Sequence, residues 1–239
     1  MSLDYRNCIN FALPYLPTNS IVIDVGCNID PIVEMNYAEW IENWNDDFTF
    51  LALESLPKAK CIGIEPMHWE SYEKRWENDP RVDLLKIGLS DRNCFETMFF
   101  PGVHHVISSF YKQEFFDQYD VQTEEVECKT LDTLSFELNL EHIDYLKIDT
   151  EGAEYKILSG SSTLLKQKRI SFIQFEYGLL DDIIPSVELI CNLLSEYGYN
   201  EVLTSGREKL WVNDQIYNTM NSDRKSTRLN SSHSSVSRM

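Results

Sequence analysis

The residues best suited to chemistry lie in the segment 146–158, which reads LKIDTEGAEYKIL. It places three acids, Asp149, Glu151 and Glu154, within six residues, directly after a mostly apolar run. The apolar run predicts a buried strand, and the acids together with Gly152 predict a sharp turn from that strand into a helix. Because carboxylates are costly to bury without a partner or a task, this turn is a candidate site.

A second candidate segment, residues 21–28, reads IVIDVGCN and ends an apolar run in a glycine turn. Open α/β sheets bind ligands at the carboxyl ends of their strands, and Gly26 would let a ligand approach the backbone closely. The dinucleotide fingerprint G-x-G-x-x-G is not met, because Asn28 and Pro31 hold the later glycine positions. A nicotinamide cofactor is therefore a weaker candidate for the ligand at this turn.

An acid also ends the next apolar run, which closes with GIEP. The two carboxylate oxygens of Glu65 could accept both hydroxyls of a ribose, and Pro66 stops the strand there. Alone, an acid after a strand favours a solvated strand end. Together with the glycine turn, it indicates a nucleotide-like ligand at the strand ends.

Short apolar runs bounded by turn residues predict the strands that would position these groups. Five core strands are expected over residues 21–25, 60–65, 82–87, 143–148 and 171–177. Amphipathic stretches over residues 69–77, 153–168 and 184–197 fit helices that pack on a parallel sheet. The predicted fold class is α/β, with a doubly wound, mostly parallel sheet.

Two further regions complete that prediction. Residues 199–204 and 209–213 flank a turn-forming quartet and predict an antiparallel C-terminal hairpin, which brings the sheet to seven strands. Residues 94–131 are rich in aromatic and β-branched residues, and they predict an inserted β-rich segment or loop that covers a site. Within it, Ser108, Ser109 and Tyr111 could touch a hydroxylated substrate, although the pattern favours turn or strand roles.

The composition limits the domain organisation and the partners. Residues 223–239 are serine-rich, basic and aperiodic, resemble a translated sequencing adapter, and are expected to be a non-native or disordered tail. Residues 1–222 fit a single domain, since single cores extend to about 250 residues before chains split. The formal net charge of −18 argues against nucleic acid or an anionic membrane as a partner.

The cysteines and the N-terminus predict the compartment. The six cysteines show no C-x-x-C spacing, and the N-terminus lacks a basic start followed by an apolar run. Reduced thiols and a cytoplasmic protein are therefore expected. Nothing in the sequence indicates the oligomeric state.

The order of glycine turn, strand-terminal acid and LKIDTEG resembles the FkbM family of S-adenosylmethionine-dependent methyltransferases. The resemblance extends to VECKTLDTL at residues 126–134 and FIQFEY at residues 172–177. It implies a Rossmann-like class I methyltransferase fold for residues 1–222 and S-adenosylmethionine as the cofactor. Carried over, it places Asp24, Gly26 and Asn28 by the methionine and sulfonium part and Glu65 by the ribose, with Cys27 and Pro66 completing the cofactor-binding set.

Methyl transfer suits a site of this kind. Since the sulfonium already makes the methyl group electrophilic, the protein mainly aligns a nucleophile, and a positioned acid adds general-base help of about 10² to 10⁴ in rate. Asp149 is the first candidate for the base or for positioning the substrate, Glu151 is the second and Glu176 the third. Glu151 could instead cap the following helix, and Glu154 could be a solvated helix residue or a partner of a lysine.

The sequence thus predicts a methyltransferase acting on an oxygen, through a hydroxyl of a sugar or another small metabolite. Acid clusters also ligate Mg²⁺, but no sequence feature demands a metal and none is assigned. The alternative from another class is a non-catalytic ligand-binding module that retains the methyltransferase fold. A nicotinamide-dependent oxidoreductase is a weaker third reading because of the glycine pattern.

Overall fold

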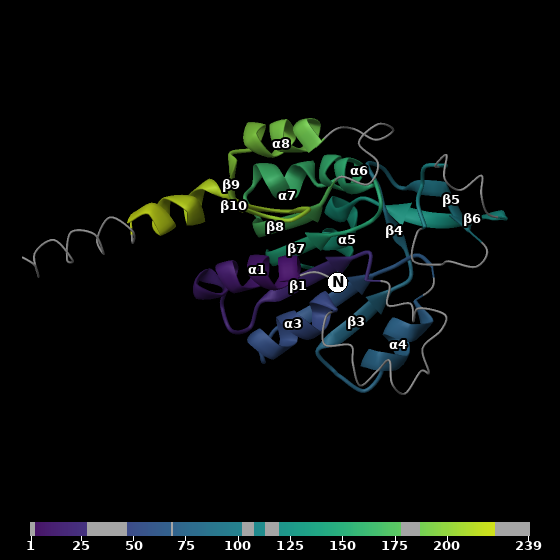
Figure 1. The fold of residues 1–239 in the computed structure, drawn as a ribbon, viewed down its shortest axis with the longest axis horizontal. Helices are drawn as coiled ribbons and strands as arrows, with labels where there is room; N and C mark the ends of the chain where they lie inside the picture. The colour runs from purple at the N-terminus through teal and green to yellow at the C-terminus, as the bar shows by residue number, and fades with distance from the viewer. Residues whose placement is uncertain are drawn as a thin grey trace, which may run out of the picture.

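The computed structural model describes residues 3–27, 47–67, 69–101, 108–112, 120–177 and 187–222. Its centre is a seven-stranded sheet in the order β3-β2-β1-β7-β8-β10-β9 (Figure 1). The strands are β1 (Ile21–Val25), β2 (Lys60–Ile64), β3 (Val82–Leu85), β7 (Ile143–Ile148), β8 (Ile170–Glu176), β9 (Tyr199–Ser205) and β10 (Glu208–Asn213). All five predicted core strands and the hairpin are present.

The strand pairing defines the edge at which a ligand would bind. β1 pairs in parallel with β2 on one side and with β7 on the other, whereas β10 runs antiparallel to both β8 and β9. The chain therefore leaves β1 in one direction, through β2 and β3, and returns to β7 on the opposite side of β1. In doubly wound sheets ligands bind where the strand order reverses, and in this sheet the reversal lies at the carboxyl ends of β1 and β7. The predicted fold class is confirmed.

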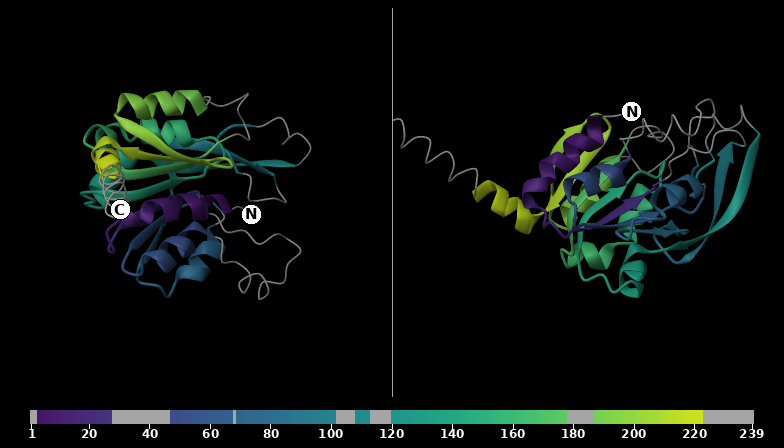
Figure 2. Two further views of the ribbon diagram at one scale, coloured as in Figure 1. Left: turned by 60° about the vertical axis from the view of Figure 1, so that its left-hand side comes forward. Right: turned by 90° about the horizontal axis from the view of Figure 1, so that it is seen from below.

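Helices cover both faces of the sheet, as Figures 1 and 2 show. One layer contains α1 (Leu3–Ala12), α3 (Phe48–Ser55) and α4 (Glu70–Trp76), with the 3-10 turn η1 (Leu13–Tyr15) after α1. The other contains α5 (Leu131–Glu137), α6 (Glu154–Ser159), α7 (Ser162–Lys166) and α8 (Val187–Glu196). Residues 214–222 form a further helical segment after β10.

Successive side chains along each strand alternate between two hydrophobic cores, one on each face of the sheet. Val22 and Tyr145 belong to the buried cluster that packs on α1 and α3, while their neighbours Ile23 and Leu146 belong to the cluster that packs on α5 to α8. This period of two follows from the pleat, which sends successive side chains to opposite faces. It explains why β1 and β7 read as nearly continuous apolar runs in the sequence.

The single helix predicted over residues 153–168 was wrong, because the chain forms the two short helices α6 and α7 instead. Gly160 separates them, and its backbone packs so closely that a Cβ there would lie 2.2 Å from the carbonyl oxygen of Ser90. The carbonyl oxygen of Gly160 also accepts a hydrogen bond from Asp132 N at 3.2 Å. This contact with a segment far away in sequence redirects the chain, and helical periodicity alone does not reveal it.

The region predicted to hold extra strands does form a second sheet. It has the order β4-β6-β5, with β4 (Gly88–Leu89), β5 (Cys94–Pro101) and β6 (Val121–Lys129), and lies at one end of the molecule in Figure 1. β5 and β6 are antiparallel. An ion pair of 2.6 Å between Lys156 Nζ and Glu96 Oε2 ties this sheet to α6.

Several expectations fall partly outside the described residues. These include Asn28, Pro31, the tail 223–239 and the first residues of the helix predicted over 184–197, of which α8 is described. All six cysteines are free thiols. Among the described residues, every helix is too short or too polar to cross a bilayer.

Candidate active site

The glycine turn after β1 and the acidic turn after β7 interlock at the carboxyl edge of the sheet. Asp149 N donates a hydrogen bond of 3.0 Å to the carbonyl oxygen of Val25, and Gly26 N donates one of 2.9 Å to the carbonyl oxygen of Ile64. The predicted convergence of the two segments is therefore confirmed. It follows from parallel pairing, in which Val25 lies opposite both Ile64 and Ile148.

Gly26 is required by this interlock rather than by open space for a ligand. Its φ is +75°, and a Cβ at this position would lie 1.8 Å from the carbonyl oxygen of Asp149. The sequence predicted that a ligand approaches the backbone at Gly26. In the structure, the close approach on the Cβ side is made by the backbone of Asp149 itself.

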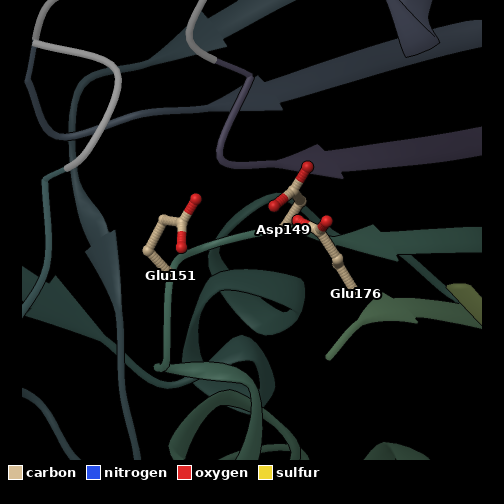
Figure 3. A group of neighbouring side chains, drawn as sticks. All are labelled: Asp149, Glu151 and Glu176. Atoms are coloured by element: carbon tan, nitrogen blue, oxygen red, sulfur yellow. The ribbon is translucent and has the colours of Figure 1, made fainter. Parts of the chain in front are cut away.

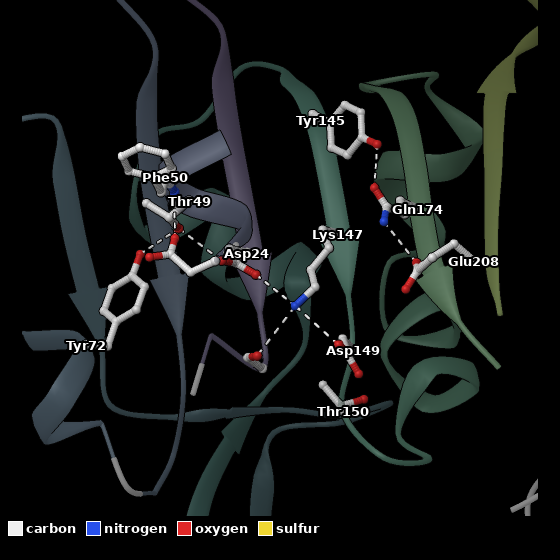
Figure 4. Close-up of polar contacts among 12 residues, drawn as sticks. Asp24, Thr49, Phe50, Tyr72, Tyr145, Lys147, Asp149, Thr150, Gln174 and Glu208 are labelled. Atoms are coloured by element: carbon white, nitrogen blue, oxygen red, sulfur yellow. Dashed lines mark hydrogen bonds and ion pairs between the residues drawn. The ribbon is translucent and has the colours of Figure 1, made fainter. Parts of the chain in front are cut away.

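Lys147 lies between the two turns, a role that the sequence analysis missed (Figure 4). It is directly opposite Asp24 in the β1–β7 register, and its Nζ is 3.1 Å from Asp24 Oδ1. The same Nζ is 3.6 Å from Asp149 Oδ2 and donates to the carbonyl oxygen of Gly26 at 3.5 Å. A lysine inside an otherwise apolar strand was the sequence signal for this role.

The second carboxylate oxygen of Asp24 is held by the helix that follows. Thr49, on α3, donates a hydrogen bond of 2.9 Å to Asp24 Oδ2, and its hydroxyl also lies 2.9 Å from the hydroxyl of Tyr72 on α4. Tyr72 fits there because Gly63 has no side chain; a Cβ on Gly63 would lie 2.6 Å from the tyrosine hydroxyl. Asp24 is thus buried and fixed from both sides, and no motif identified Thr49 or Tyr72.

The three acids proposed for catalysis come together (Figure 3). Asp149, Glu151 and Glu176 are all partly buried, and one carboxylate oxygen from each lies within 4.8 Å of the others. The Arg207 guanidinium, from the hairpin turn between β9 and β10, forms an ion pair of 2.5 Å with Glu176 Oε1. The sequence placed Glu176 third, and its position at the end of β8 brings it beside Asp149.

Proximity changes the protonation of two members of this cluster. Burial, then the charge of Asp149 and a hydrogen bond with it, raises the pKa of Glu176 to about 9, although Arg207 opposes the shift. Burial, followed by the charges of Asp149 and Glu154, raises the pKa of Glu151 to about 7. Near neutral pH, the Asp149–Glu176 pair therefore holds a proton, and the hydrogen bond between the two carboxyl groups shares it.

The turn that carries the cluster is built around Glu154. Its Oε1 accepts hydrogen bonds from Thr150 N at 3.0 Å, Thr150 Oγ1 at 2.9 Å and Gly152 N at 3.3 Å. Burial raises the pKa of Glu154, while the hydrogen bonds from Thr150 and Gly152 oppose that shift. The expectation of a solvated helix residue or a lysine partner was wrong, because this carboxylate faces the turn rather than the solvent.

Glu151 does not cap α6, the alternative that the sequence left open. The N-cap of α6 is Ala153, which makes no side-chain capping bond, and Glu151 is in the left-handed region with φ +51°. Ser109, from the inserted region, donates a hydrogen bond of 2.8 Å to the carbonyl oxygen of Glu151. The insertion therefore contacts the acidic turn, as expected of a segment that covers a site.

The residues assigned to the cofactor lie around the ends of β1 and β2. Glu65 is 7% exposed, and its Oε1 accepts a hydrogen bond of 3.0 Å from Met67 N. Burial, then the charges of Asp24 and Glu65, raises the pKa of the Cys27 thiol well above its ordinary value, so the thiol is neutral. Pro66 directly follows Glu65 past the end of β2. Asn28 lies outside the described residues.

The groups at the strand ends suit a positively charged nucleotide, and they do not require a metal ion. The carboxylates of Asp24 and Asp149 lie at the ends of β1 and β7, and that of Glu65 lies at the end of the neighbouring β2. The acid cluster is compact enough for a divalent cation to reach its oxygens. However, Lys147, Arg207 and the protonation of Glu176 already offset the negative charge, so a metal stays unassigned.

Comparison with known proteins agrees with this arrangement. The methyltransferase FkbM domain matches residues 24–201, which is most of the chain and includes both turns. The chain belongs to the FkbM methyltransferase family. Within that family match lie Asp24, Lys147, Asp149 and Glu176.

Two individual similarities are more distant. The AMB antimetabolite synthetase AmbE of Pseudomonas aeruginosa is 26% identical over 194 residues, and the match covers 65% of this chain but only 8% of AmbE. The structure of a precorrin-6y C5,15-methyltransferase from Geobacter metallireducens aligns with a TM-score of 0.41 and 11% identity, over 85% of this chain and 83% of that one. The match to AmbE thus spans only a small part of the length of that protein.

Proposed function

We propose that this FkbM-family chain is an S-adenosylmethionine-dependent O-methyltransferase that methylates a hydroxyl group of a sugar or another small metabolite. The family match and the doubly wound sheet support methyl transfer. The observation that carries the finer assignment is the interlock of the two turns, because it sets Asp24 and Asp149 side by side at the carboxyl edge. In-line transfer requires the methyl donor and the base that serves the acceptor to lie next to each other.

The division of labour follows the two strands. Asp24, Gly26, Cys27 and Asn28 form the methionine side, and Glu65 with Pro66 forms the ribose side. When bound, the cofactor would supply an electrophilic methyl group on its sulfonium. The chain's own task is to hold the acceptor oxygen in line with that group and to take its proton.

Asp149 is the residue proposed to take that proton. Its carboxylate is near the Lys147 ammonium, and the Glu176 carboxyl can donate a hydrogen bond to it. The methyl–sulfur bond would break as the bond from the methyl carbon to the acceptor oxygen forms, and the hydroxyl proton of the acceptor would pass to a carboxylate oxygen of Asp149. The hydrogen bond with Glu176 holds the Asp149 carboxyl group in place. A base of this kind contributes about 10² to 10⁴ in rate.

The acceptor is proposed to be a small molecule or a glycan, and the protein is proposed to be cytoplasmic. The net charge of −18 disfavours nucleic acid and anionic membranes as partners. Ser109 contacts the acidic turn and the second sheet is tied to the neighbouring helix α6, so the inserted region would lie beside a bound acceptor. Its residues are the proposed source of specificity.

Two measurements test the proposal. Calorimetric titration of the full chain with S-adenosylmethionine should show saturable binding; no binding would favour a non-catalytic module with another ligand. A methyl-transfer screen with labelled cofactor, across glycans and small hydroxylated metabolites, should then identify the acceptor.

Asp149→Asn should keep cofactor affinity and slow turnover by at least about tenfold. Unchanged turnover would remove Asp149 from the mechanism.

A further inference from the structure

Lys147 is an unusual residue for the centre of a sheet. It is 4% exposed and lies on β7, between β1 and β8, with Asp24 and Gln174 opposite it in the two registers. Burying an ammonium is costly unless its partners are well placed, and hydrophobic residues of similar volume often serve stability equally well. The alternation of β7 would allow an apolar residue here. The charge therefore points to a task other than stability.

The contacts of Lys147 join the two sides of the proposed site. Its Nζ approaches Asp24 Oδ1 at 3.1 Å and the carbonyl oxygen of Gly26 at 3.5 Å, both on the cofactor side. It approaches Asp149 Oδ2 at 3.6 Å, on the acceptor side. Figure 4 shows the lysine side chain pointing along the sheet toward the gap between these groups.

Other titratable or charged groups surround this contact, and they come from several elements. They are the Cys27 thiol after β1, Asp47 before α3 with its partner Arg75 of α4 at 2.8 Å, Glu176 at the end of β8, and Arg207 of the hairpin turn. Asp47 and Glu176 each have a cationic partner of their own in Arg75 and Arg207. By contrast, Asp24 and Asp149 share the Lys147 ammonium.

We propose that Lys147 is a positioning residue for methyl transfer, whose single buried ammonium holds the Asp24 carboxylate of the cofactor side and the Asp149 carboxylate of the acceptor side in fixed relation. This inference rests on the proposed function. Binding of the sulfonium would change the electrostatic interaction between Asp24 and Lys147. It would thereby also change the interaction between Lys147 and Asp149, because both carboxylates interact with one cation. Lys147 touches neither substrate nor cofactor in this role.

Replacing Lys147 by methionine gives a specific expectation. Two carboxylates near each other without their cation cannot both stay ionised at low cost, so the pair takes up a proton. When the sulfonium binds, its positive charge takes the place of that proton, and the proton is released. Lys147→Met should therefore release about one proton more than wild type on binding S-adenosylmethionine, with affinity reduced by about tenfold or more.

The proton count is measured by titration calorimetry of the full chain in buffers that differ in ionisation enthalpy. Lys147→Arg keeps the charge and should show the wild-type proton count. Lys168→Met is the matched control, because this partly buried lysine pairs with Asp214 at 3.6 Å just before β8, at the amino edge of the sheet. It should leave both the affinity and the proton count unchanged.

The outcomes separate this inference from the proposed function. If wild type binds the cofactor but Lys147→Met matches its proton count, the lysine is only structural and the inference is overturned while the proposed function stands. If wild type does not bind, both fall. Should Lys147→Met fail to fold, the side-chain ammonium resonance of Lys147 in the wild type, assigned by its loss in Lys147→Arg, must shift on cofactor addition; no shift overturns the inference.

Discussion

The two faces of the central sheet differ in what they bury. The face toward α5 to α8 is lined by apolar side chains, with Ile23, Leu146 and Ile173 adjacent on β1, β7 and β8. The face toward α1 and α3 carries a polar row one residue further along, with Asp24, Lys147 and Gln174 adjacent on the same strands.

The polar row continues away from the site and stays hydrogen-bonded. Gln174 Oε1 accepts a bond of 2.5 Å from the Tyr145 hydroxyl, and its Nε2 donates one of 2.9 Å to Glu208 Oε2, as Figure 4 shows. Buried polar groups fix a unique arrangement when their partners are present, and they are costly when partners are lost. Both faces bury an apolar core, but only the face toward α1 and α3 also carries this polar row. A mutation in the core toward α5 to α8 should therefore lower stability without changing the site.

The largest expected loss of stability comes from the apolar face. Leu164, on α7, is 1% exposed within that core, and Leu164→Ala should lower the free energy of unfolding by about 2 to 5 kcal/mol because it leaves a cavity. Urea denaturation measures the change. Cofactor affinity, measured by calorimetry on the folded protein, should stay unchanged; a parallel loss of affinity would show that the faces are not separable.

A loss of stability together with a loss of binding is expected at the glycine turn after β1. Gly26→Ala forces a residue with φ +75° into the backbone of Asp149, and the conformation alone costs about 1 to 3 kcal/mol. Because the two turns must move apart, cofactor affinity should fall as well. Gly198→Ala is the control, since it has a similar φ of +69° but meets the flexible Lys168 side chain. Equal affinities in both variants would contradict the interlock.

The last expected effect is on the pH dependence of stability. Burial and Asp149 raise the pKa of Glu176 to about 9, so the folded state holds a proton that the unfolded state releases above about pH 4.5. The stability linked to this proton is complete below that value and is lost as pH rises through about 9. Wild type should lose stability between about pH 5 and pH 9, and Glu176→Gln should lose less.

Thermal melts across that range measure the slope. Glu201→Gln on β9 is the matched control. Burial has the largest single effect on the pKa of Glu201 and raises it, but hydrogen bonds from Thr204 and Lys209 and the charge of Lys209 together lower it below its ordinary value. A lowered pKa gives stability that is lost only as pH falls, so this variant should keep the wild-type slope in the same range. A slope unaffected by Glu176→Gln would show that the acid is already ionised near neutral pH.

Much of the architecture could be read from local pattern. The bounds predicted for β1 and β7 agree with the structure, and Asp149, Glu151 and Glu176 were named because acids at strand ends stand out against apolar runs. The division of residues 153–168 into two helices could not be read in this way. It depends on the contact of Gly160 with Ser90, which are far apart in sequence.

The sequence by itself determined the strands, the mostly parallel kind of sheet and the acids at the strand ends, because period, burial and turn chemistry act over a few neighbouring residues. Only the tertiary structure decided which acids share a cation, that Glu154 organises the turn, and that Gly26 makes room for Asp149. Those roles depend on distances between segments more than a hundred residues apart, or on the direction in which one side chain turns. Local pattern contains neither quantity.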